Sequence, residues 1–355
     1  MQSDFQKSLQ KLLNKYPQHK EEKALYDALK ELLDKARKED EAFVFKAENI
    51  ANVVVNNIPN FFEVKENTQS IKTGFLEFDR SFGGFLKGEY TIIAGRPSMG
   101  KSQFMVNIAL NMLHLDYGVA YFSFDLNKTH LLSRFLACKS DVAVSKILQN
   151  KLSDAEKVQV EKDAVEISTK NLFICDATVY KIEAMEEECR RLVKEQNVEV
   201  VFIDYIQMID NMINSGSYYN RDRELGKISR KFKKLAMDLN IAVICSSQLN
   251  RSVESRGGEK KPYLSDLRDS GNIEQDADKV IFIYRPEYYG LSEDQEGQST
   301  KYLTEIIIAK NRNGSIGSLN LSRTPEFTGF KEYEYTIEEK VIEIPKDRLK
   351  DFDIF

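Results

Sequence analysis

A segment between residues 95 and 102 carries the strongest chemical signal in the sequence. It matches G-x-x-x-x-G-K-[S/T], the pattern of a loop whose backbone N–H groups surround phosphates. An apolar run at 90–94 precedes it and apolar residues at helical spacing follow it, so the sequence predicts a strand, a loop and a helix in the order that such a site requires. Lys101 is expected to reach the β- and γ-phosphates of a nucleotide, and Ser102 to ligate Mg²⁺. The predicted phosphate loop is Gly95, Arg96, Pro97, Ser98, Met99, Gly100, Lys101 and Ser102.

Two carboxylates follow other predicted strands. Asp204 ends the apolar run 200–203, and Asp125 ends the run 121–124. In open α/β sheets the nucleotide lies at the carboxyl edge of the strands, so we expect Asp204 to hold Mg²⁺. Asp125 has two interpretations: it orients the water that attacks the γ-phosphate, or it caps the amino end of the helix that follows.

Polar residues later in the chain allow both functional and ordinary interpretations. Gln248, just past a predicted strand, is either a sensor of the γ-phosphate or a loop glutamine. The polar stretch 250–278 is expected to be a loop, and its basic side chains suit either contact with a nucleic-acid backbone or solvent. Lys310 and Arg312 precede an Asn-Gly pair that predicts a tight hairpin. Their cations either complete a neighbour's nucleotide site, as an arginine finger does, or belong to an ordinary charged hairpin.

These residues need a scaffold, and the sequence predicts an α/β fold with a mainly parallel sheet, because strand and helix patterns alternate from residue 90 to about 320. Residues 1–59 predict a helical amino-terminal appendage, 60–330 the main domain, and 331–355 a charged tail that is an edge strand or an arm. The predicted strands lie at 90–94, 119–124, 172–174, 198–203, 241–246, 279–284 and 303–309, and the predicted helices at 127–139, 154–169, 181–195 and 221–239.

Composition limits the class of protein. The 355 residues are 42% hydrophobic and carry a net charge of −5, so any contact with nucleic acid requires a local basic surface. The four cysteines are scattered, which predicts free thiols in a reducing cytoplasm. The three histidines form no ligand cluster. The sequence predicts neither a signal peptide nor a membrane span.

Together the motifs resemble the ATPase core of DnaB-type replicative DNA helicases from about residue 73 to 330. The phosphate loop GRPSMGK matches that family residue for residue. The matching segments further along are Ile203–Tyr205, Ser247–Arg251, Leu264–Arg268, Ile273–Asp278, Ile307–Lys310 and Arg312–Gly314.

The resemblance implies a RecA-like P-loop fold and a ring, usually a hexamer, with ATP and Mg²⁺ at subunit boundaries and single-stranded DNA in the central channel. It implies that Lys101, Ser102 and Asp204 bind Mg-ATP and that Gln248 senses the γ-phosphate. It also implies that Lys310 and Arg312 serve the adjacent subunit, that Arg285 lies near the base, and that Arg268, Asp269 and Gly271 belong to the loop that grips DNA. A primase or a loader is a further candidate partner in a cytoplasmic primosome.

The chain departs from the family pattern at three places. Asp125 and Asp269 stand where the family has glutamate. The shorter carboxylate at 125 is expected to slow hydrolysis. The helical segment 1–57 stands in place of the family's globular amino-terminal domain, and its last part is a candidate linker helix. Two other functions therefore compete with a helicase that translocates 5′→3′: a RecA-fold, DNA-dependent ATPase that does not unwind, and a degenerate module that retains only ring assembly or DNA binding.

Overall fold

The computed structural model describes residues 69–176, 182–209, 218–294 and 297–334, with the side chains of 218–223 and 268–272 outside that description. The chain divides into two compact units, Met1–Glu66 and Asn67–Phe355, and every described residue belongs to the second. The predicted helical appendage at 1–59 and the tail beyond 334 therefore lie outside the described residues.

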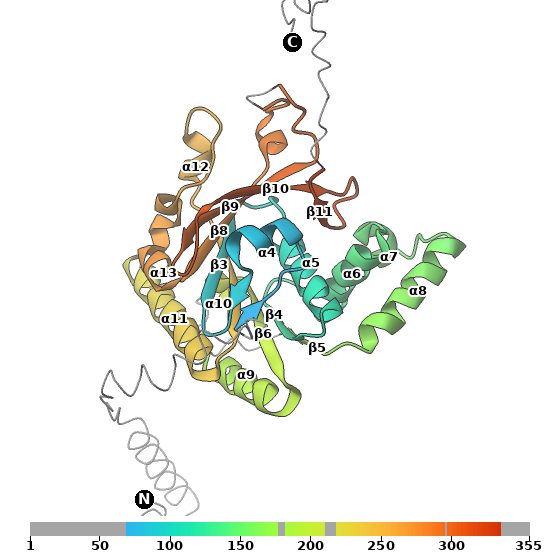
Figure 1. Ribbon diagram of the computed structural model, residues 1–355, viewed down its shortest axis with the longest axis horizontal. Coiled ribbons are helices and arrows are strands. Elements are labelled where there is room, and N and C mark those ends of the chain that lie inside the picture. Colours follow the sequence, from blue (N-terminus) through green and yellow to red (C-terminus); the bar gives the residue numbers. More distant parts are fainter. Residues whose placement is uncertain (1–68, 177–181, 210–217, 295–296, 335–355) are drawn as a thin grey trace, which may run out of the picture. The chain divides into compact units, whose positions relative to one another are not determined.

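One nine-stranded sheet runs through the second unit (Figure 1). Its strands are β3 (Tyr90–Gly95), β4 (Gly118–Ser123), β5 (Leu172–Asp176), β6 (Val198–Asp204), β7 (Ala242–Gln248), β8 (Lys279–Tyr284), β9 (Leu303–Asn311), β10 (Gly317–Arg323) and β11 (Phe330–Glu332). The order across the sheet is β11-β10-β9-β8-β3-β7-β6-β4-β5. Neighbours from β8 to β5 pair in parallel, and β9, β10 and β11 extend the sheet antiparallel. The predicted α/β fold with a mainly parallel sheet is confirmed.

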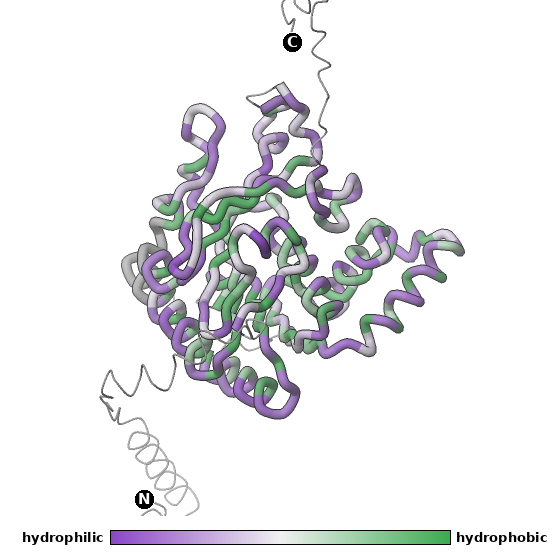
Figure 2. The backbone as a smooth tube through the Cα atoms, viewed as in Figure 1, coloured by the Kyte–Doolittle hydropathy of each residue, from purple (hydrophilic) through white to green (hydrophobic). Residues whose placement is uncertain are grey.

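Helices cover both faces of the sheet (Figure 1). One face carries α4 (Leu76–Phe82), α5 (Lys101–His114), α6 (Lys128–Ser140), α7 (Val144–Leu148) and α8 (Asp154–Ser168). The other face carries α9 (Ile182–Gln196), α10 (Ile206–Ile209), α11 (Tyr218–Leu239) and α13 (Gly271–Asp276). The central strands are apolar on both sides, as expected for parallel strands between two helical layers (Figure 2). Along β3, for example, Ile93 enters one core, while Ile92 and Ala94 enter the other.

A small two-stranded sheet, β1 (Ser70–Ile71) and β2 (Phe85–Leu86), precedes the first long strand. Gly83 and Gly84 connect α4 to β2 with positive φ angles of 74° and 69°. A Cβ on Gly84 would come within 2.4 Å of the Ile71 carbonyl oxygen, so only glycine fits this turn. A glycine turn thus precedes the phosphate-loop strand.

Two local predictions differ from the structure. The stretch 250–278 is not one loop, because it contains α12 (Ser252–Ser255), the 3₁₀ helix η3 (Leu264–Ser270) and α13. The hairpin between β9 and β10 forms, but five residues, 312–316, connect the strands instead of two. Neither Asn313 nor Gly314 adopts the positive φ of a tight type I′ turn. The Asn313 amide donates instead to the Glu89 carboxylate, at 2.6 Å, and holds the wider loop in place.

Candidate functional site

The carboxyl ends of the parallel strands open onto a cavity of about 630 Å³. Parallel pairing brings these ends to one edge of the sheet, so residues that follow β3, β4, β6, β7 and β8 meet there. The predicted residues that line the cavity are Pro97, Ser98, Gly100, Lys101, Ser102, Asp125, Asp204, Gln248 and Arg285.

The phosphate loop bends tightly between β3 and α5. Gly100 precedes the helix with a φ of 100°, and a Cβ there would lie 2.5 Å from the Phe327 ring. Ser98 also has a positive φ, of 64°. The Lys101 ammonium donates to the carbonyl oxygens of Gly95, at 2.9 Å, and Arg96, at 3.1 Å. Burial lowers the pKa of Lys101 to about 8, although the Asp204 carboxylate acts in the opposite direction.

Arg96 and Met99 turn away from the cavity. Only 6% of Arg96 is exposed, and its guanidinium bonds the Glu254 carboxylate at 2.7 and 2.9 Å and the Leu249 carbonyl oxygen at 2.8 Å. Met99 is buried in the core. Both residues therefore fix the shape of the loop. Arg96 bonds it to the segment after β7, and Met99 packs it against the hydrophobic core.

Asp204 is held by two hydroxyl groups at the end of β6. The Ser246 hydroxyl donates to one carboxylate oxygen, at 2.5 Å, and the Tyr121 hydroxyl donates to the other, at 3.3 Å. Burial, followed by the negative charge of Asp204, raises the pKa of Tyr121 well above its usual range, so this phenol stays a donor. The carboxylate is 4% exposed, at the floor of the cavity.

Asp125 is exposed at the cavity, and it is not the helix cap. Asn127 caps α6, because its side-chain oxygen accepts the His130 N–H at 2.9 Å. The alternative of an Asp125 N-cap is therefore wrong, since the helix begins two residues later than that alternative requires. The carboxylate of Asp125 remains available at the cavity wall.

Gln248 ends β7 with an exposed side chain at the cavity. The neighbouring Gln207, on α10, holds the backbone at this point. Its amide nitrogen donates to the Ser247 hydroxyl at 2.9 Å, and its amide oxygen accepts the Gln248 N–H at 3.3 Å. The end of the strand is thus fixed while the Gln248 side chain faces the cavity.

Arg285 and two residues from the antiparallel edge form one side of the cavity mouth. The Arg285 guanidinium donates to the Ser98 carbonyl oxygen at 3.0 Å and lies 4.9 Å from the centre of the Phe327 ring. Arg323 lies 5.5 Å from the same ring. Burial, with the nearby Arg323 charge, lowers the pKa of Arg285. A flat cation over an aromatic ring offers a stacking surface beside the phosphate loop.

Lys310 and Arg312 lie far from this cavity, at the opposite edge of the sheet. Their hairpin begins where Asn311 pairs with Lys279, the first residue of β8. Arg312 donates to the Asp278 carboxylate at 3.0 Å and to the Gln275 carbonyl oxygen at 2.5 Å. The Lys310 ammonium donates to the Glu274 carbonyl oxygen at 2.6 Å. The structure therefore does not bring the hairpin cations to the nucleotide residues of their own chain.

The predicted DNA-gripping residues lie on the elements that precede β8. Arg268 and Asp269 are in η3, and Gly271 begins α13; the side chains at these positions fall outside the described part of the chain. The carboxyl end of α13 provides the carbonyl oxygens that hold Lys310 and Arg312. The predicted DNA loop and the hairpin cations are thus neighbours in the fold.

Sequence reasoning missed several residues that line the cavity, namely Gln103, Arg134, Tyr205, Arg323 and Phe327. Arg134 projects from α6, nine positions after Asp125, and no spacing rule marks it. Arg323 and Phe327 come from the antiparallel edge, far along the chain. Of these residues, only Tyr205 could have been found from the sequence, because it belongs to a segment that matches the family motif.

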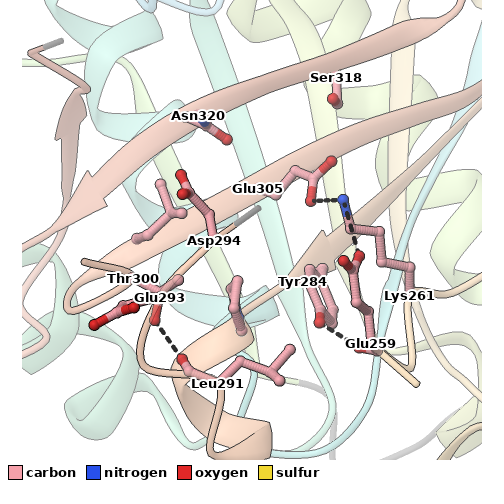
Figure 3. Close-up of a pocket in the computed structure, with 12 residues that line it drawn as sticks. Glu259, Lys261, Tyr284, Leu291, Glu293, Asp294, Thr300, Glu305, Ser318 and Asn320 are labelled. Atoms are coloured by element: carbon pink, nitrogen blue, oxygen red, sulfur yellow. Dashed lines mark hydrogen bonds and ion pairs between the residues drawn. The ribbon is translucent and has the colours of Figure 1, made fainter. Parts of the chain in front are cut away.

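A second cavity, of about 420 Å³, lies beside β8, β9 and β10 (Figure 3). Its wall holds an ion-pair network in which the Lys261 ammonium lies 2.9 Å from the Glu305 carboxylate and 3.7 Å from that of Glu259. No predicted site residue lines it. Within the described part of the chain, no helix combines the length and apolar character needed to cross a membrane, and no three His, Cys, Asp or Glu residues gather as metal ligands.

Comparison with known proteins agrees with this geometry. The family model described as "DnaB-like helicase C terminal domain" matches residues 70–332. The chain is 36% identical to "Replicative DNA helicase DnaC" of Bacillus subtilis (strain 168) over 88% of its length and 67% of that protein's. It is 37% identical to "Probable plasmid replicative DNA helicase" of Chlamydia psittaci, over 74% of its length and 56% of the relative's. The chain thus spans between about half and two thirds of these relatives.

Among the solved structures that are similar to the chain are two that cover most of it. One, an isolated ATPase domain, superposes with a TM-score of 0.72 at 31% identity, covering 81% of this chain and all of that one (100%). The other, "The Structure Of A DnaB-Like Replicative Helicase And Its Interactions With Primase", gives a TM-score of 0.75 at 28% identity, covering 94% of this chain and 76% of the other. The RecA-like core predicted from the motifs is confirmed by these similarities.

Proposed function

The chain belongs to the DnaB-like helicase family, and we propose that it is an ATP-driven replicative helicase that moves 5′→3′ on single-stranded DNA as a ring. The observation that carries this proposal is the separation between its two sets of charged groups. Lys101, Asp125 and Asp204 gather at the carboxyl edge of the sheet, whereas Lys310 and Arg312 are fixed at the opposite edge.

The separation supports a site that two chains complete together. Lys279 pairs with Asn311 on one side and with Thr91 of β3 on the other. Thr91 lies four residues before Gly95, the last residue of β3. At about 3.3 Å per residue the two edges lie roughly 13 Å or more apart along the strand. We infer that a second copy, placed head to tail, brings its Arg312 to the cavity. Repeated contacts of that kind between two different surfaces close into a ring, and a hexamer is the family's usual size.

The residues at the cavity have different roles in ATP hydrolysis. Backbone N–H groups of the loop and the Lys101 ammonium bind the phosphates, and Asp125 orients the attacking water. Gln248 contacts the γ-phosphate from the end of β7. Arg312 of one subunit stabilises the negative charge that develops in the site of the next. Because its hairpin is bonded to α13, a shift at the nucleotide of one subunit moves the predicted DNA loop of another.

The residues present fit a magnesium ion. Mg²⁺ prefers oxygen ligands and keeps several waters, and the cavity offers the Ser102 hydroxyl and the Asp204 carboxylate. Ser246 and Tyr121 orient that carboxylate by donating to both of its oxygens. A bound Mg²⁺ would neutralise phosphate charge.

A strand-displacement assay separates this function from the alternative of a RecA-fold ATPase that does not unwind. With a forked duplex that has a 5′ single-stranded arm, ATP is expected to drive strand release, and a fork with only a 3′ arm is not expected to support it. DNA-stimulated ATP hydrolysis without displacement from either fork would favour the alternative. Lack of both activities would favour a degenerate ring or DNA-binding module.

We expect Asp125→Glu to raise the kcat of DNA-stimulated ATP hydrolysis by about ten-fold, because the longer side chain brings the carboxylate closer to the attacking water. Asp125→Asn, which keeps the length but removes the charge, is expected to lower kcat. Steady-state ATPase assays compare the three proteins. A turnover that does not rise in Asp125→Glu would contradict this role for the shorter side chain.

The lowered pKa of Lys101, about 8, predicts how ATP affinity depends on pH. Below this pKa the ammonium is charged and affinity is not limited by this group. Above it the amine must first take up a proton, so affinity is expected to fall by about ten-fold per pH unit until other groups titrate. Equilibrium binding of a non-hydrolysable ATP analogue measures this. Lys101→Arg serves as the control, because a guanidinium stays charged, and an equal decline in that variant would contradict the assignment.

Partners beyond DNA and the chain itself follow from the resemblance. One of the similar solved structures is named for its interactions with primase, and a primase or a loader is a candidate partner here. Cytoplasmic localisation also stays a prediction.

A further inference from the structure

The Asp278 carboxylate lies buried at the edge of the sheet that holds the hairpin cations. Its side chain is 5% exposed. One oxygen accepts the Tyr90 N–H at 2.8 Å and the Lys233 ammonium at 2.7 Å. The other oxygen accepts a guanidinium N–H of Arg312 at 3.0 Å. A single buried carboxylate thus joins β3, α11 and the hairpin.

Arg312 depends on this carboxylate for its orientation. Its side chain is 46% exposed, and its described partners are Asp278 and the Gln275 carbonyl oxygen. The backbone repeats the link, because the Arg312 N–H donates to the Asp278 carbonyl oxygen at 2.9 Å. A guanidinium has five N–H donors in a fixed plane, so these two contacts fix that plane and leave donors for a phosphate.

The backbone of Asp278 is also tied to the strand that ends in the phosphate loop. The Asp278 N–H donates to the Tyr90 carbonyl oxygen at 2.8 Å, and the Asp278 carboxylate accepts the Tyr90 N–H in return. Tyr90 begins β3, whose other end is Gly95. The position of the hairpin cation is therefore fixed relative to a central strand of its own subunit, and not only to a surface loop.

We propose that Asp278 is a positioning residue for the reaction in the neighbouring subunit: it holds the Arg312 guanidinium in the orientation that meets the neighbour's γ-phosphate. This inference rests on the proposed function, because it needs Arg312 to act across the subunit boundary. An arginine side chain has many rotamers, and fixing it before assembly removes an entropic cost from each encounter with the nucleotide. Asp278 acts only through Arg312 and does not contact the nucleotide itself.

A double-mutant cycle tests the proposal. Asp278→Asn keeps the shape of the side chain and removes its charge. We expect it to lower the kcat of DNA-stimulated ATP hydrolysis by about a hundred-fold, because a misplaced catalytic group costs about that much, with the KM for ATP changed by less than about two-fold. In an Arg312→Ala background, Asp278→Asn is expected to cause no further loss. An equal loss in both backgrounds would overturn the proposal.

Controls separate positioning from folding. Asp238→Asn removes an ion-paired carboxylate of α11, whose partner is Arg190 at 3.4 Å, and should leave kcat unchanged. Should Asp278→Asn lower the unfolding temperature below the assay temperature, the cycle is run with Asp278→Glu. That variant keeps a charge for Lys233 but shifts the carboxylate by one methylene, and its loss of kcat must likewise vanish in the Arg312→Ala background.

The outcomes also distinguish this inference from the function it rests on. An impaired Arg312→Ala together with a normal Asp278→Asn would refute the positioning role alone. A normal kcat in Arg312→Ala itself would refute the shared site, and the positioning role with it.

Discussion

Arg312→Ala is expected to lower the kcat of DNA-stimulated ATP hydrolysis by about a thousand-fold or more, the loss that follows removal of an arginine finger. The guanidinium is held by Asp278 and Gln275, so the wild-type side chain is already oriented for the neighbour's site. ATP binding should change little, because each chain keeps its own phosphate loop. Steady-state hydrolysis measures the loss of kcat, and equilibrium binding of an ATP analogue measures the unchanged affinity.

Arg191→Ala is the matched control for this variant. Arg191 is a half-exposed arginine of α9 that pairs with Glu188 at 2.7 Å on its own helix. Its removal is expected to leave hydrolysis unchanged. A wild-type kcat in Arg312→Ala, at protein concentrations where rings form, would contradict the role of the hairpin.

Lys101→Ala is expected to lower the rate of hydrolysis strongly by a different route. Lys101 is the only lysine among the residues that line the described cavity, and it lies in the first turn of α5, where we propose that the phosphates bind. Loss of one such charge-stabilising donor lowers kcat by about a hundred- to a thousand-fold, and ATP affinity should fall as well. Lys170→Ala, which removes a surface lysine paired with Asp116, should have neither effect. Unwinding that survives in Lys101→Ala would contradict a nucleotide-driven motor.

Thermal stability provides a check on the Lys101→Ala variant. Removing Lys101 takes away a buried positive charge whose pKa is lowered by desolvation. The fold is therefore not expected to lose stability in Lys101→Ala, and thermal unfolding should confirm this before activity is compared.

Much of the site followed from the sequence because parallel strands share an edge. The phosphate loop, Asp125, Asp204 and Gln248 each end an apolar run, and runs of that kind placed their last residues at one cavity. To predict that residues following parallel strands meet at one edge, only the strands must be assigned, and runs of β-branched and aromatic residues indicate them. The strand order is not needed for this, and that order was not predicted.

Other features of the site depend on contacts between segments that are distant in the sequence, and no local sequence pattern predicts such contacts. Arg96 leaves the cavity because Glu254 lies beside it after β7, 158 positions later in the chain. Arg134 and Phe327 reach the cavity from a helix face and from the loop between β10 and β11. The helix cap is a contrasting case: Asn127 and Asp125 are both good caps by type, and only the helix start decides between them.

The hairpin also shows the limit of a short motif. Asn313-Gly314 predicts a two-residue turn, but the bond from Asn313 to buried Glu89 and the bonds of Arg312 to Asp278 favour a wider loop. The residue types were interpreted correctly as a hairpin that carries the two cations. Their anchoring on α13 and β3 required the tertiary structure.

Mixing two inactive variants tests the shared site most directly. Lys101→Ala keeps an intact hairpin, and Arg312→Ala keeps an intact phosphate loop. The two proteins are combined with single-stranded DNA before rings assemble. Subunit boundaries that join an intact phosphate loop to an intact hairpin should then raise the rate of ATP hydrolysis well above the sum of the rates of the separate proteins. A mixture no more active than that sum, while each variant still assembles and binds DNA, would contradict a site completed by the adjacent subunit.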